Sequence, residues 1–584
     1  MSSNPLFTFA IITDTHIRPP SGDQSSPFPV NDLANGRARY AVASIARHAP
    51  AFTIHLGDMV HPLPHLPTYS EAAEEALRMF EPLGKNVHYV PGNHDIGDKP
   101  MAGSPAGPVT EETAGLYGQF FGEDFYSFEH SGLRFIVINS SLAGTGNALE
   151  ERQKEWLEQE LADNADQRLI LFSHYPPFVN TADEPLHYDN YEHASRAWLL
   201  DLLEKHKVEA VFCGHVHQFF YNRAGDTKLY CLPPTSFIRQ DYSELYPVEP
   251  AAEFGRNDTG KFSYALIDVY DQGHRLRVIP TEGRSLEADE VLSAEDPAIA
   301  RPLAKPLTVH LRHAWARAVD LPYNGPMEEF GRKRARDDYP LLRLWQMGIE
   351  SVRTPLSDLV DPEYGARIRD WAATGIRFCL FHSGVPSFEL WQECKNHASF
   401  IDAVEFVTST GDLSDVAEDL ADFVRGSGPD VQISKFHSSA HEAESGSRFA
   451  HSVSPGFKWA ERDGVLAALR ANDRNGVVQG VSFQVNLVDD LVAGLLEMND
   501  WCRETGYRSQ AVVRLATANP AISNFDREAI DKRIQLALRT AADTPLVSLQ
   551  LDVFADVDRG YHPRYGLIDR RSNLRRAGES LAGQ

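Results

Sequence analysis

The sequence predicts an α/β protein in two parts: a layered α/β domain followed by a (β/α)8 barrel. Three observations lead to this fold class. Short apolar runs rich in Val, Ile and Phe alternate with amphipathic segments along the chain. The alternation becomes a regular strand–helix repeat after Leu307. The length of 584 residues is several times the ~150 residues of a typical domain, so more than one domain is expected.

The first part, residues 1–285, contains apolar runs that each end in a polar cluster. A buried strand that leads into a functional loop has this pattern. The runs lie at 7–16, 52–58, 87–95, 135–141, 169–176 and 210–217. Helix-like segments lie between them at 31–48, 70–83, 148–161 and 192–206. Three later runs have no helices between them and predict antiparallel strands: 229–235, 261–271 and 275–283.

The second part begins after a charged stretch at 286–306, which contains Pro and Ala, has no clear strand and is predicted to be a linker. Residues 307–584 form the second predicted domain. Its strand candidates are 307–313, 350–354, 376–382, 402–408, 431–437, 480–486, 511–517 and 546–554. Helical stretches separate them, among them 413–424, 459–470, 490–503 and 527–540. This repeat fits a (β/α)8 barrel; an open doubly wound sheet is the alternative.

The charge balance argues against two classes of partner. The chain has 56 Lys and Arg against 82 Asp and Glu, which gives a net charge of −26. So acidic a protein repels phosphate backbones and anionic lipid headgroups, and we expect neither general nucleic-acid binding nor membrane binding. Bound metal ions would still allow it to hold a single phosphate group.

The cysteines and the N-terminal segment indicate a protein of the cytoplasm. The five cysteines have wide, irregular spacing, which fits neither a disulfide framework nor a zinc-binding pattern. The chain starts without a basic segment, and no apolar stretch reaches the ~18–20 residues of a membrane span. We therefore expect a cytoplasmic protein.

Side chains of metal-ligand type gather at the ends of the apolar runs in the first part. They are Asp14, His16, Asp58, Asn93, His94, His174, His215 and His217. The carboxyl ends of strands in an open sheet share one crevice, so these residues are expected to converge. Gly57, Gly92 and Gly214 precede ligand candidates and permit close backbone approach. Mixed oxygen and imidazole ligands favour Fe, Mn, Zn or Co over Ca or Mg, and the set predicts a dinuclear metal site.

Five motif blocks occur in order: D-T-H at 14–16, G-D at 57–58, G-N-H-D at 92–95, a lone His at 174 and G-H-V-H at 214–217. This set resembles the calcineurin-like metallophosphoesterases over residues 6 to about 270. The D-T-H opening and the compact spacing are most similar to bacterial phosphodiesterases that act on cyclic nucleotides and glycerophosphodiesters. The resemblance implies a β-sandwich flanked by helices for the first domain.

The resemblance also implies two divalent or transition metal ions as cofactors, whose identity (Fe, Mn, Zn or Co) it leaves open. One ion would be held by Asp14, His16 and His217. The other would be held by Asn93, His174 and His215. Asp58 would bridge both ions.

The same resemblance assigns catalytic roles to Asp58, Asn93 and His94. A metal-bridging hydroxide would attack phosphorus, while His94 contacts the phosphate and protonates the leaving group. Asp95 is expected to orient His94. Two loop-type segments, 180–193 and 233–254, are candidates to fold over the site, with solvated loops as the alternative. The substrate-contact candidates are His94, His187, His193, Arg239 and Tyr242.

The barrel is expected to be non-catalytic. Its C-terminal stretch is similar to the last strand, loop and helix of glycoside-hydrolase-like barrels. Such hydrolases need two facing carboxyl groups, often on strands four and seven. Here strand four offers only Glu405, and strand seven offers none. A scaffold that supports a homo-oligomer, or that frames the phosphoesterase pocket, is the main expectation. A sugar-shaped binding or architectural barrel comes next, and a separate activity on carbohydrate is the remaining alternative.

The sequence therefore predicts a dinuclear, metal-dependent hydrolase of a small phosphodiester with a glycerol- or sugar-linked substituent. A cyclic-nucleotide phosphodiesterase or a phosphomonoesterase with the same site is the alternative within enzymes. A binding or regulatory protein that has lost catalysis is the alternative from another class. The native metal pair, the natural substrate and the oligomeric state stay open.

Overall fold

The structure of the chain is a computed structural model. It describes residues 4–22, 26–293, 305–312, 314–322, 332–408, 428–436, 455–473, 476–516, 526–551, 553–556 and 565–583. The chain divides into two compact units. The first unit comprises Met1–Ile299 and Ala318–Tyr339, and the second comprises Ala300–Arg317 and Pro340–Gln584. Each unit is thus built from two separate segments of the chain.

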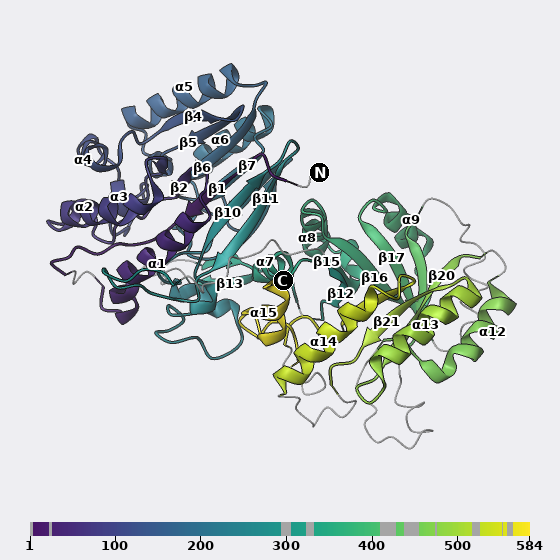
Figure 1. Ribbon diagram of the computed structural model, residues 1–584. Helices are drawn as coiled ribbons and strands as arrows, with labels where there is room; N and C mark the ends of the chain where they lie inside the picture. The colour runs from purple at the N-terminus through teal and green to yellow at the C-terminus, as the bar shows by residue number, and fades with distance from the viewer. Residues whose placement is uncertain are drawn as a thin grey trace. The chain divides into compact units, whose positions relative to one another are not determined.

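Two mixed sheets form the centre of the first unit (Figure 1). One has the order β11-β10-β1-β2-β3: β1 (Phe7–Ile12), β2 (Thr53–His55), β3 (Val87–Tyr89), β10 (Ser263–Val269) and β11 (His274–Pro280). The other has the order β4-β5-β6-β7-β9-β8: β4 (Tyr126–His130), β5 (Leu133–Val137), β6 (Arg168–Ser173), β7 (Ala210–Cys213), β8 (Phe220–Ala224) and β9 (Thr227–Cys231). Each sheet contains a block of parallel strands: β1, β2 and β3 at one side of the first sheet, and β5, β6, β7 and β9 in the middle of the second.

The two sheets pack face to face through a layer of phenylalanines. The ring of Phe9 on β1 lies 5.7 Å from the ring of Phe135, 6.1 Å from that of Phe172 and 6.4 Å from that of Phe212. All four side chains are completely buried. Edge-to-face aromatic pairs of this kind add to the burial free energy, so this layer fixes the sheets against each other.

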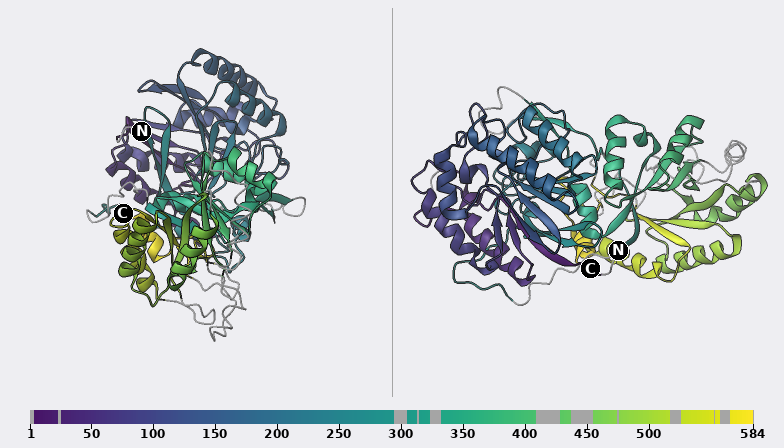
Figure 2. Two further views of the ribbon diagram at one scale, coloured as in Figure 1. Left: turned by 90° about the vertical axis from the view of Figure 1, so that its right-hand side faces the viewer. Right: turned by 90° about the horizontal axis from the view of Figure 1, so that it is seen from above.

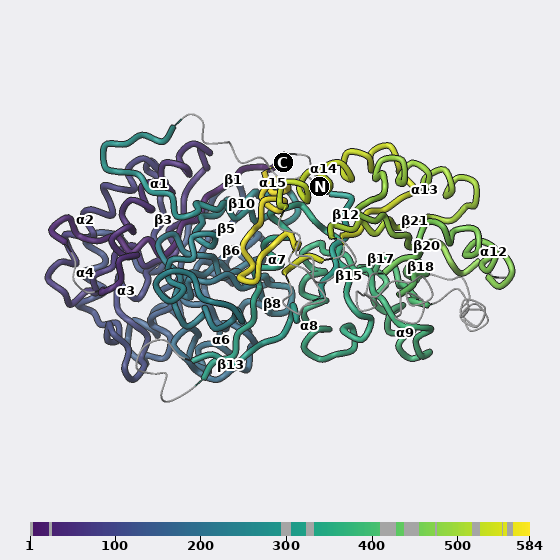
Figure 3. The backbone as a smooth tube through the Cα atoms, turned by 90° about the horizontal axis from the view of Figure 1, so that it is seen from below, coloured from purple at the N-terminus to yellow at the C-terminus, as the bar shows by residue number. Residues whose placement is uncertain are grey.

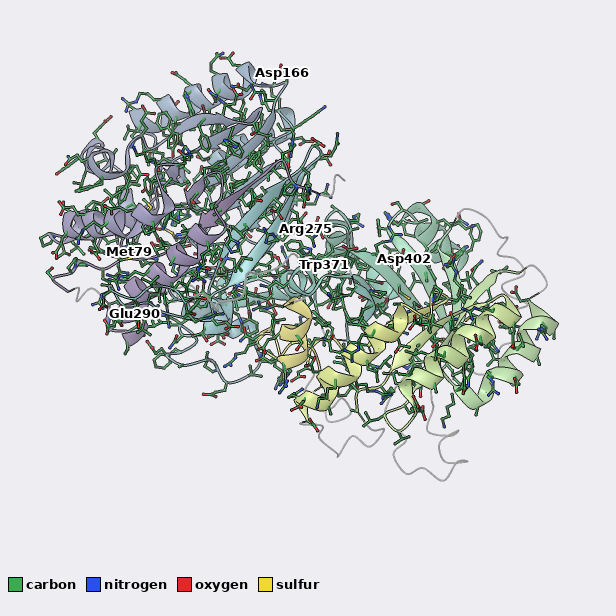
Figure 4. All side chains as sticks on the ribbon, in the orientation of Figure 1. Met79, Asp166, Arg275, Glu290, Trp371 and Asp402 are labelled. Atoms are coloured by element: carbon green, nitrogen blue, oxygen red, sulfur yellow. The ribbon has the colours of Figure 1, made fainter. Side chains whose placement is uncertain are left out.

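Helices cover the outer face of each sheet. On the first sheet lie α1 (Ala34–Arg47) and α2 (Tyr69–Phe80), whose apolar residues form one cluster with Ile12 and Leu266. Met79 of α2, labelled in Figure 4, belongs to this cluster. On the second sheet, α5 (Ala148–Asp163) and α6 (His193–Lys205) pack over Leu171 and Val211. The first unit is therefore the β-sandwich flanked by helices that the resemblance implied.

The predicted strands and helices of the first unit are confirmed, with ends that differ by a few residues. The edge strands β4 and β8 were not predicted from the sequence. Nor were two helices that follow β3, α3 (Asn93–Ile96) and α4 (Glu111–Phe121). The run at 229–235 forms β9, which pairs antiparallel with β8 and parallel with β7.

A hairpin from beyond the predicted linker belongs to the first unit. It consists of β13 (Val319–Pro322) and β14 (Arg332–Ala335), which pair antiparallel. Leu321 and Ala335 join an apolar cluster with Phe220 and Tyr242. Through Leu321 and Phe220, this cluster joins β13 to β8, and both strands are labelled in Figure 3.

The second unit is a closed barrel of eight parallel strands (Figure 2). The strands are β12 (Lys305–His310), β15 (Ile349–Pro355), β16 (Arg377–Ser383), β17 (Ile401–Val407), β18 (Asp430–Ser434), β20 (Val478–Val485), β21 (Arg508–Val513) and β22 (Val547–Leu551). The ring closes because β18 pairs with β20 and β22 pairs with β12. A two-residue strand, β19 (Phe457–Lys458), adds to β20. All eight predicted barrel strands are confirmed.

Helices alternate with these strands: α7 (Tyr339–Met347), α8 (Pro362–Ala372), α9 (Phe388–Asn396), α12 (Arg462–Asn472), α13 (Leu491–Thr505), α14 (Arg527–Ala541) and α15 (Arg576–Ala582). The helix predicted at 413–424 lies outside the described residues. Inside the barrel, Glu405 accepts two hydrogen bonds from the Arg353 guanidinium, at 2.6 and 3.0 Å. Both side chains are fully buried, so this carboxylate is already neutralised by a bidentate partner.

Two further predictions bear on the chain as a whole. The five cysteines are all buried and none forms a disulfide. Across the part of the chain that the structure describes, no helix combines the length and apolar character that a membrane crossing requires.

Candidate metal centre

The candidate ligands lie where parallel strands of both sheets end. Asp14 and His16 follow β1, Asp58 follows β2, and Asn93 begins α3 directly after β3. His174 follows β6, and His215 and His217 follow β7. The carboxyl ends of parallel strands meet at one edge, so the sandwich gathers these loops from both of its sheets.

Five of these residues adopt a backbone conformation that is rare outside glycine. The φ angles are 52° at Asp14, 46° at His16, 53° at Asp58, 64° at His215 and 55° at His217. A left-handed φ in a residue with a Cβ costs energy and persists where the surrounding structure imposes it. The strain reflects sharp turns that bring these side chains into one place.

Two glycines allow the loops to approach so closely. A Cβ at Gly92 would lie 2.1 Å from the backbone nitrogen of Asp58. Gly57 has a φ of 100°, and a Cβ there would lie 2.5 Å from Nδ1 of His174. No side chain fits at such distances, which confirms that these glycines serve close backbone approach.

The first group of donors consists of Asp14, His16, Asp58 and His217. One ligand atom from each lies within 4.8 Å of the others. Nε2 of His217 is 3.1 Å from Oδ1 of Asp14 and 3.1 Å from Nε2 of His16. Nε2 of His16 is also 3.5 Å from Oδ2 of Asp58.

The second group consists of Asp58, Asn93, His174 and His215. Oδ1 of Asn93 lies 3.2 Å from Nε2 of His174 and 2.9 Å from Nδ1 of His215. Nε2 of His174 is 3.3 Å from Oδ1 of Asp58. Asp58 therefore presents Oδ2 to the first group and Oδ1 to the second.

The buried donors of the first group fit a cation better than they fit one another. Oδ1 of Asp14 is buried and takes part in no hydrogen bond within the described chain. The Nε2 atoms of His16 and His217 face each other at 3.1 Å. Carboxylate oxygens and imidazole nitrogens that converge in this way match the ligand preference of divalent transition metals.

In His174 and His217, the ring nitrogen that points away from the other donors has a backbone carbonyl as its hydrogen-bond acceptor. Nδ1 of His174 donates to the carbonyl oxygen of Leu56 at 2.7 Å, and Nδ1 of His217 donates to that of Phe237 at 2.6 Å. A carbonyl oxygen can only accept, so both rings carry their proton on Nδ1. Nε2 of each ring is then available as a ligand, as in most histidine–metal sites.

Burial and neighbouring charge set the protonation of the donors. Burial lowers the pKa of His215 to about 3 and holds the pKa of His16 well below its ordinary value. Burial also disfavours the charged form of His174, but the Asp58 carboxylate outweighs this and raises the pKa of His174 to about 9. Asp58 has a pKa well below its usual range because His174 outweighs its burial. Asp58 is therefore an ionised donor, and His16 and His215 are neutral ones.

His94 is oriented by a different group than the one expected. Its Nδ1 donates to the carbonyl oxygen of His61 at 2.6 Å, and its backbone nitrogen donates to Oδ1 of Asp58 at 2.8 Å. Asp95 instead accepts hydrogen bonds from the backbone nitrogens of Gly92 and Val60, at 2.9 and 3.3 Å. The expected role of Asp95 is thus wrong: this carboxylate stabilises the loop, and the His61 carbonyl orients His94.

The predicted substrate contacts occupy varied places. His187 is buried against Glu184 at 3.1 Å, whereas His193 is exposed at the start of α6 and accepts from Arg196. Arg239 and Tyr242 are both buried and donate to the carboxylate of Asp189. These contacts keep Arg239 and Tyr242 beside His215, and their contact with a substrate stays a prediction.

Sequence reasoning missed four residues around the donors. His61 lies three residues after Asp58, Tyr188 and Asp189 lie within the 180–193 segment, and Lys333 lies on β14. Nδ1 of His61 is 3.4 Å from Nδ1 of His16. The hydroxyl of Tyr188 accepts a hydrogen bond from Nδ2 of Asn93 at 3.2 Å, which turns Oδ1 of Asn93 toward the histidines. Only His61 lies near enough to a motif to be suspected from sequence.

Comparison with known proteins matches the part of the chain that contains the candidate ligands. Residues 7–219 match the family described as calcineurin-like phosphoesterase. The serine/threonine-protein phosphatase CPPED1 of Mus musculus is 32% identical over 177 residues, which are 29% of this chain and 54% of that protein. A Rhodococcus erythropolis protein described as "Probable cyclic nucleotide phosphodiesterase" is 27% identical over 267 residues, 43% of this chain and 77% of that protein.

The chain thus spans about half the length of the mammalian relative. Among solved structures, a purple acid phosphatase from yellow lupin seeds is 16% identical, with a TM-score of 0.35, and the alignment covers 49% of this chain and 53% of that one. The family match includes every candidate ligand from Asp14 to His217. Residues 7–219 are therefore similar to the calcineurin-like phosphoesterases, and this part of the chain contains the whole candidate metal centre.

Proposed function

We propose that the first unit is a dinuclear, metal-dependent hydrolase of a small phosphodiester. One observation carries the proposal: two groups of converging donors share Asp58, which presents a different carboxylate oxygen to each. A bridging carboxylate between two donor groups is what a pair of neighbouring metal ions requires.

The ligands of the first ion would be Asp14, His16, Asp58 and His217, and those of the second Asp58, Asn93, His174 and His215. When bound, two divalent ions supply Lewis acidity: they make hydroxide available near neutral pH and neutralise phosphoryl oxygens. Nδ1 of His174 and of His217 donates to the carbonyls of Leu56 and Phe237, so Nε2 is the nitrogen that each ring would offer to an ion. Because Asp58 raises the pKa of His174, this ring would release its second proton when an ion binds.

His94 is placed to act on the leaving group. Nδ1 is committed to the His61 carbonyl, so a proton given to the departing alkoxide comes from Nε2. The bond from the backbone nitrogen of His94 to Asp58 ties this residue to the centre of the site. His94 thus has both a fixed ring orientation and a single free nitrogen.

A diester is favoured over a monoester as the substrate. The relative described as a phosphodiesterase aligns over 267 residues and 77% of its length, whereas the relative named as a phosphatase aligns over 54% of its length. The net charge of the chain is −26, and a negative overall field disfavours a dianionic monoester more than a monoanionic diester. We propose a glycerol- or sugar-linked diester, with a cyclic nucleotide as the second candidate.

Turnover of two chromogenic substrates tests the proposal. Metal-loaded protein is expected to hydrolyse bis(p-nitrophenyl) phosphate faster than p-nitrophenyl phosphate, and Asp58→Asn is expected to lose both activities. Glu129→Gln, at an exposed edge of the same unit, serves as the control. Equal or faster turnover of the monoester would reject the diesterase assignment, and an inert wild-type protein would reject the whole proposal.

A further inference from the structure

His215 differs from the other candidate histidine ligands in the chemical group next to the ring nitrogen that points away from the donors. His174 and His217 donate to backbone carbonyls, and His16 lies against another imidazole. Nε2 of His215 is buried and makes no hydrogen bond within the described chain, but it faces a carboxylate, with Oδ1 of Asp189 at 3.5 Å. Its Nδ1 faces the second donor group. A carboxylate behind a ligating histidine fixes the ring and increases its basicity.

Asp189 is itself held in a buried charge cluster. The side chains around it are Arg239, Asp241, Tyr242 and Lys333, all of which are buried. Oδ1 accepts from Arg239, and Oδ2 accepts from the hydroxyl of Tyr242 at 2.9 Å and from Nζ of Lys333 at 2.5 Å. Nζ of Lys333 also lies 2.5 Å from Oδ2 of Asp241.

The charges of this cluster balance only when Lys333 is included. Two carboxylates, Asp189 and Asp241, face two cations, Arg239 and Lys333. Without Lys333, Arg239 alone would have to compensate both carboxylates in a buried place, where an unpaired charge is strongly unfavourable. Asp189 would then be drawn toward Arg239 or toward water and away from its place behind His215.

The backbone around both members of the pair is fixed. Nζ of Lys99 donates to the carbonyl oxygens of His187 and Asn190, which flank Asp189. On the other side, Arg336 ties the end of the hairpin to the carbonyl oxygens of Asn180 and Tyr221, at 3.0 Å each. Both segments are therefore anchored independently of the contact between Asp189 and Lys333.

We propose that Asp189 and Lys333 are a positioning pair that holds His215 with Nδ1 toward the second metal ion. Through Lys333, the β13–β14 hairpin completes the metal centre, although it follows the family match by about a hundred residues. This inference rests on the proposed two-ion function.

Mn²⁺ binding to the full-length protein tests the pair. Binding is followed by calorimetry and by electron paramagnetic resonance, in which two neighbouring ions give an exchange-coupled signal. Lys333→Met is expected to lower the affinity for the second ion by roughly 10- to 100-fold and to remove the coupled signal, while the affinity for the first ion stays the same. Lys333→Arg is expected to restore the signal. Arg334→Met, on the exposed face of the same strand, is the matched control and is expected to match the wild type.

Asp189→Asn is the second test variant, in case Lys333→Met fails to fold. The change is isosteric, so it keeps the volume of the side chain. It is expected to weaken the second ion in the same way. Unchanged second-ion affinity in Asp189→Asn, or in a folded Lys333→Met, overturns the inference while leaving the two-ion proposal intact. Wild-type protein that binds one ion or none overturns the two-ion proposal itself, and the inference with it.

Discussion

Asp58 is the residue through which the two donor groups and His94 are connected. Its carboxylate faces His16 with one oxygen and His174 with the other, and it accepts the backbone hydrogen of His94. His94 itself contributes no atom to the second donor group, but one of its ring nitrogens lies within 4.8 Å of ligand atoms of His16 and His61. Metal content therefore has to be measured alongside proton transfer when its ring is removed.

His94→Ala is expected to lower kcat by roughly 10²- to 10⁴-fold for a diester with an alkyl leaving group. The loss should be smaller for bis(p-nitrophenyl) phosphate, because p-nitrophenolate leaves without needing a proton. Steady-state kinetics on both substrates, with metal content checked for each protein, measures the difference. An equal loss on both would mean that His94 contributes through phosphate binding alone.

Gly92→Ala is expected to abolish activity and second-ion binding, because its Cβ would collide with the backbone nitrogen of Asp58. Gly118→Ala is the control: Gly118 lies in α4 with open space around its Cβ position. The control should raise stability by about 0.5–1 kcal/mol, since alanine is the better helix former. Metal titration and thermal melts distinguish the two; normal metal binding by Gly92→Ala would contradict the close-approach argument.

For individual residues, the sequence predicts the candidate metal ligands and misses the side chains that position them. The ligands fall in short motifs at strand ends, where local spacing and residue type are both visible. Tyr188, Asp189 and Lys333 act through one other side chain, and nothing in their local sequence marks them. Lys333 is more than a hundred residues from His217, so its role depends entirely on tertiary contact.

Between elements, one ion-pair cluster joins the two sheets at the end away from the metal centre. Arg168, at the start of β6, binds Glu209 through two nitrogens at 2.7 and 3.0 Å. Glu209 also accepts from His274 of β11 at 2.6 Å, and Arg168 donates to the carbonyl oxygens of Tyr270 and Gly273. The cluster therefore spans from the second sheet to the β10–β11 hairpin of the first.

Burial would raise the pKa of Glu209, but His274 and Arg168 outweigh it and lower this pKa to about 2. A lowered pKa stabilises the fold above the unfolded value near 4.5, and this contribution is lost as pH falls toward 2. Glu209→Gln is expected to cost about 1–2 kcal/mol at pH 7, with the difference from wild type shrinking below pH 4.5. Urea unfolding at pH 7 and pH 3 measures it, with Glu129→Gln as an exposed control. A variant as stable as the wild type at pH 7 would contradict this.

Secondary structure was predictable where an element has a buried apolar face. The central strands of both sheets are strongly apolar, and each of the eight barrel strands buries at least two apolar side chains. By contrast, β4 contains Ser127, Glu129 and His130, and β8 contains Asn222 and Arg223. Edge strands have one unpaired side and tolerate polar residues, which weakens their sequence signal.

On the scale of the whole molecule, the chain passes between its two units three times. It leaves the first unit after Ile299, returns to it at Ala318 and leaves again after Tyr339. The first barrel strand, β12, lies in the intervening segment. Neither unit is therefore a continuous stretch of sequence, which composition and periodicity alone do not reveal.

A fragment of residues 1–285 is expected to melt at a lower temperature than the first unit of the full chain. It lacks Leu321, Ala335 and Lys333, so it exposes the apolar cluster around Phe220 and leaves Asp189 and Asp241 without their shared cation. Second-ion affinity should fall at least as far as in full-length Lys333→Met. Calorimetric melts and Mn²⁺ titration of both proteins measure this; a fragment that matches the full chain in both would show that the hairpin is dispensable.

The position of Lys333 in the sequence also fixes when the site is finished during synthesis. The ribosome makes the last ligand, His217, more than a hundred residues before Lys333. At roughly 5–20 residues per second, this interval is on the order of ten seconds. During that time the nascent first unit has all its ligands but not the lysine behind them. If Lys333 positions His215 as proposed, full metal loading is expected only after the hairpin has emerged, when the first strand of the barrel has already been translated.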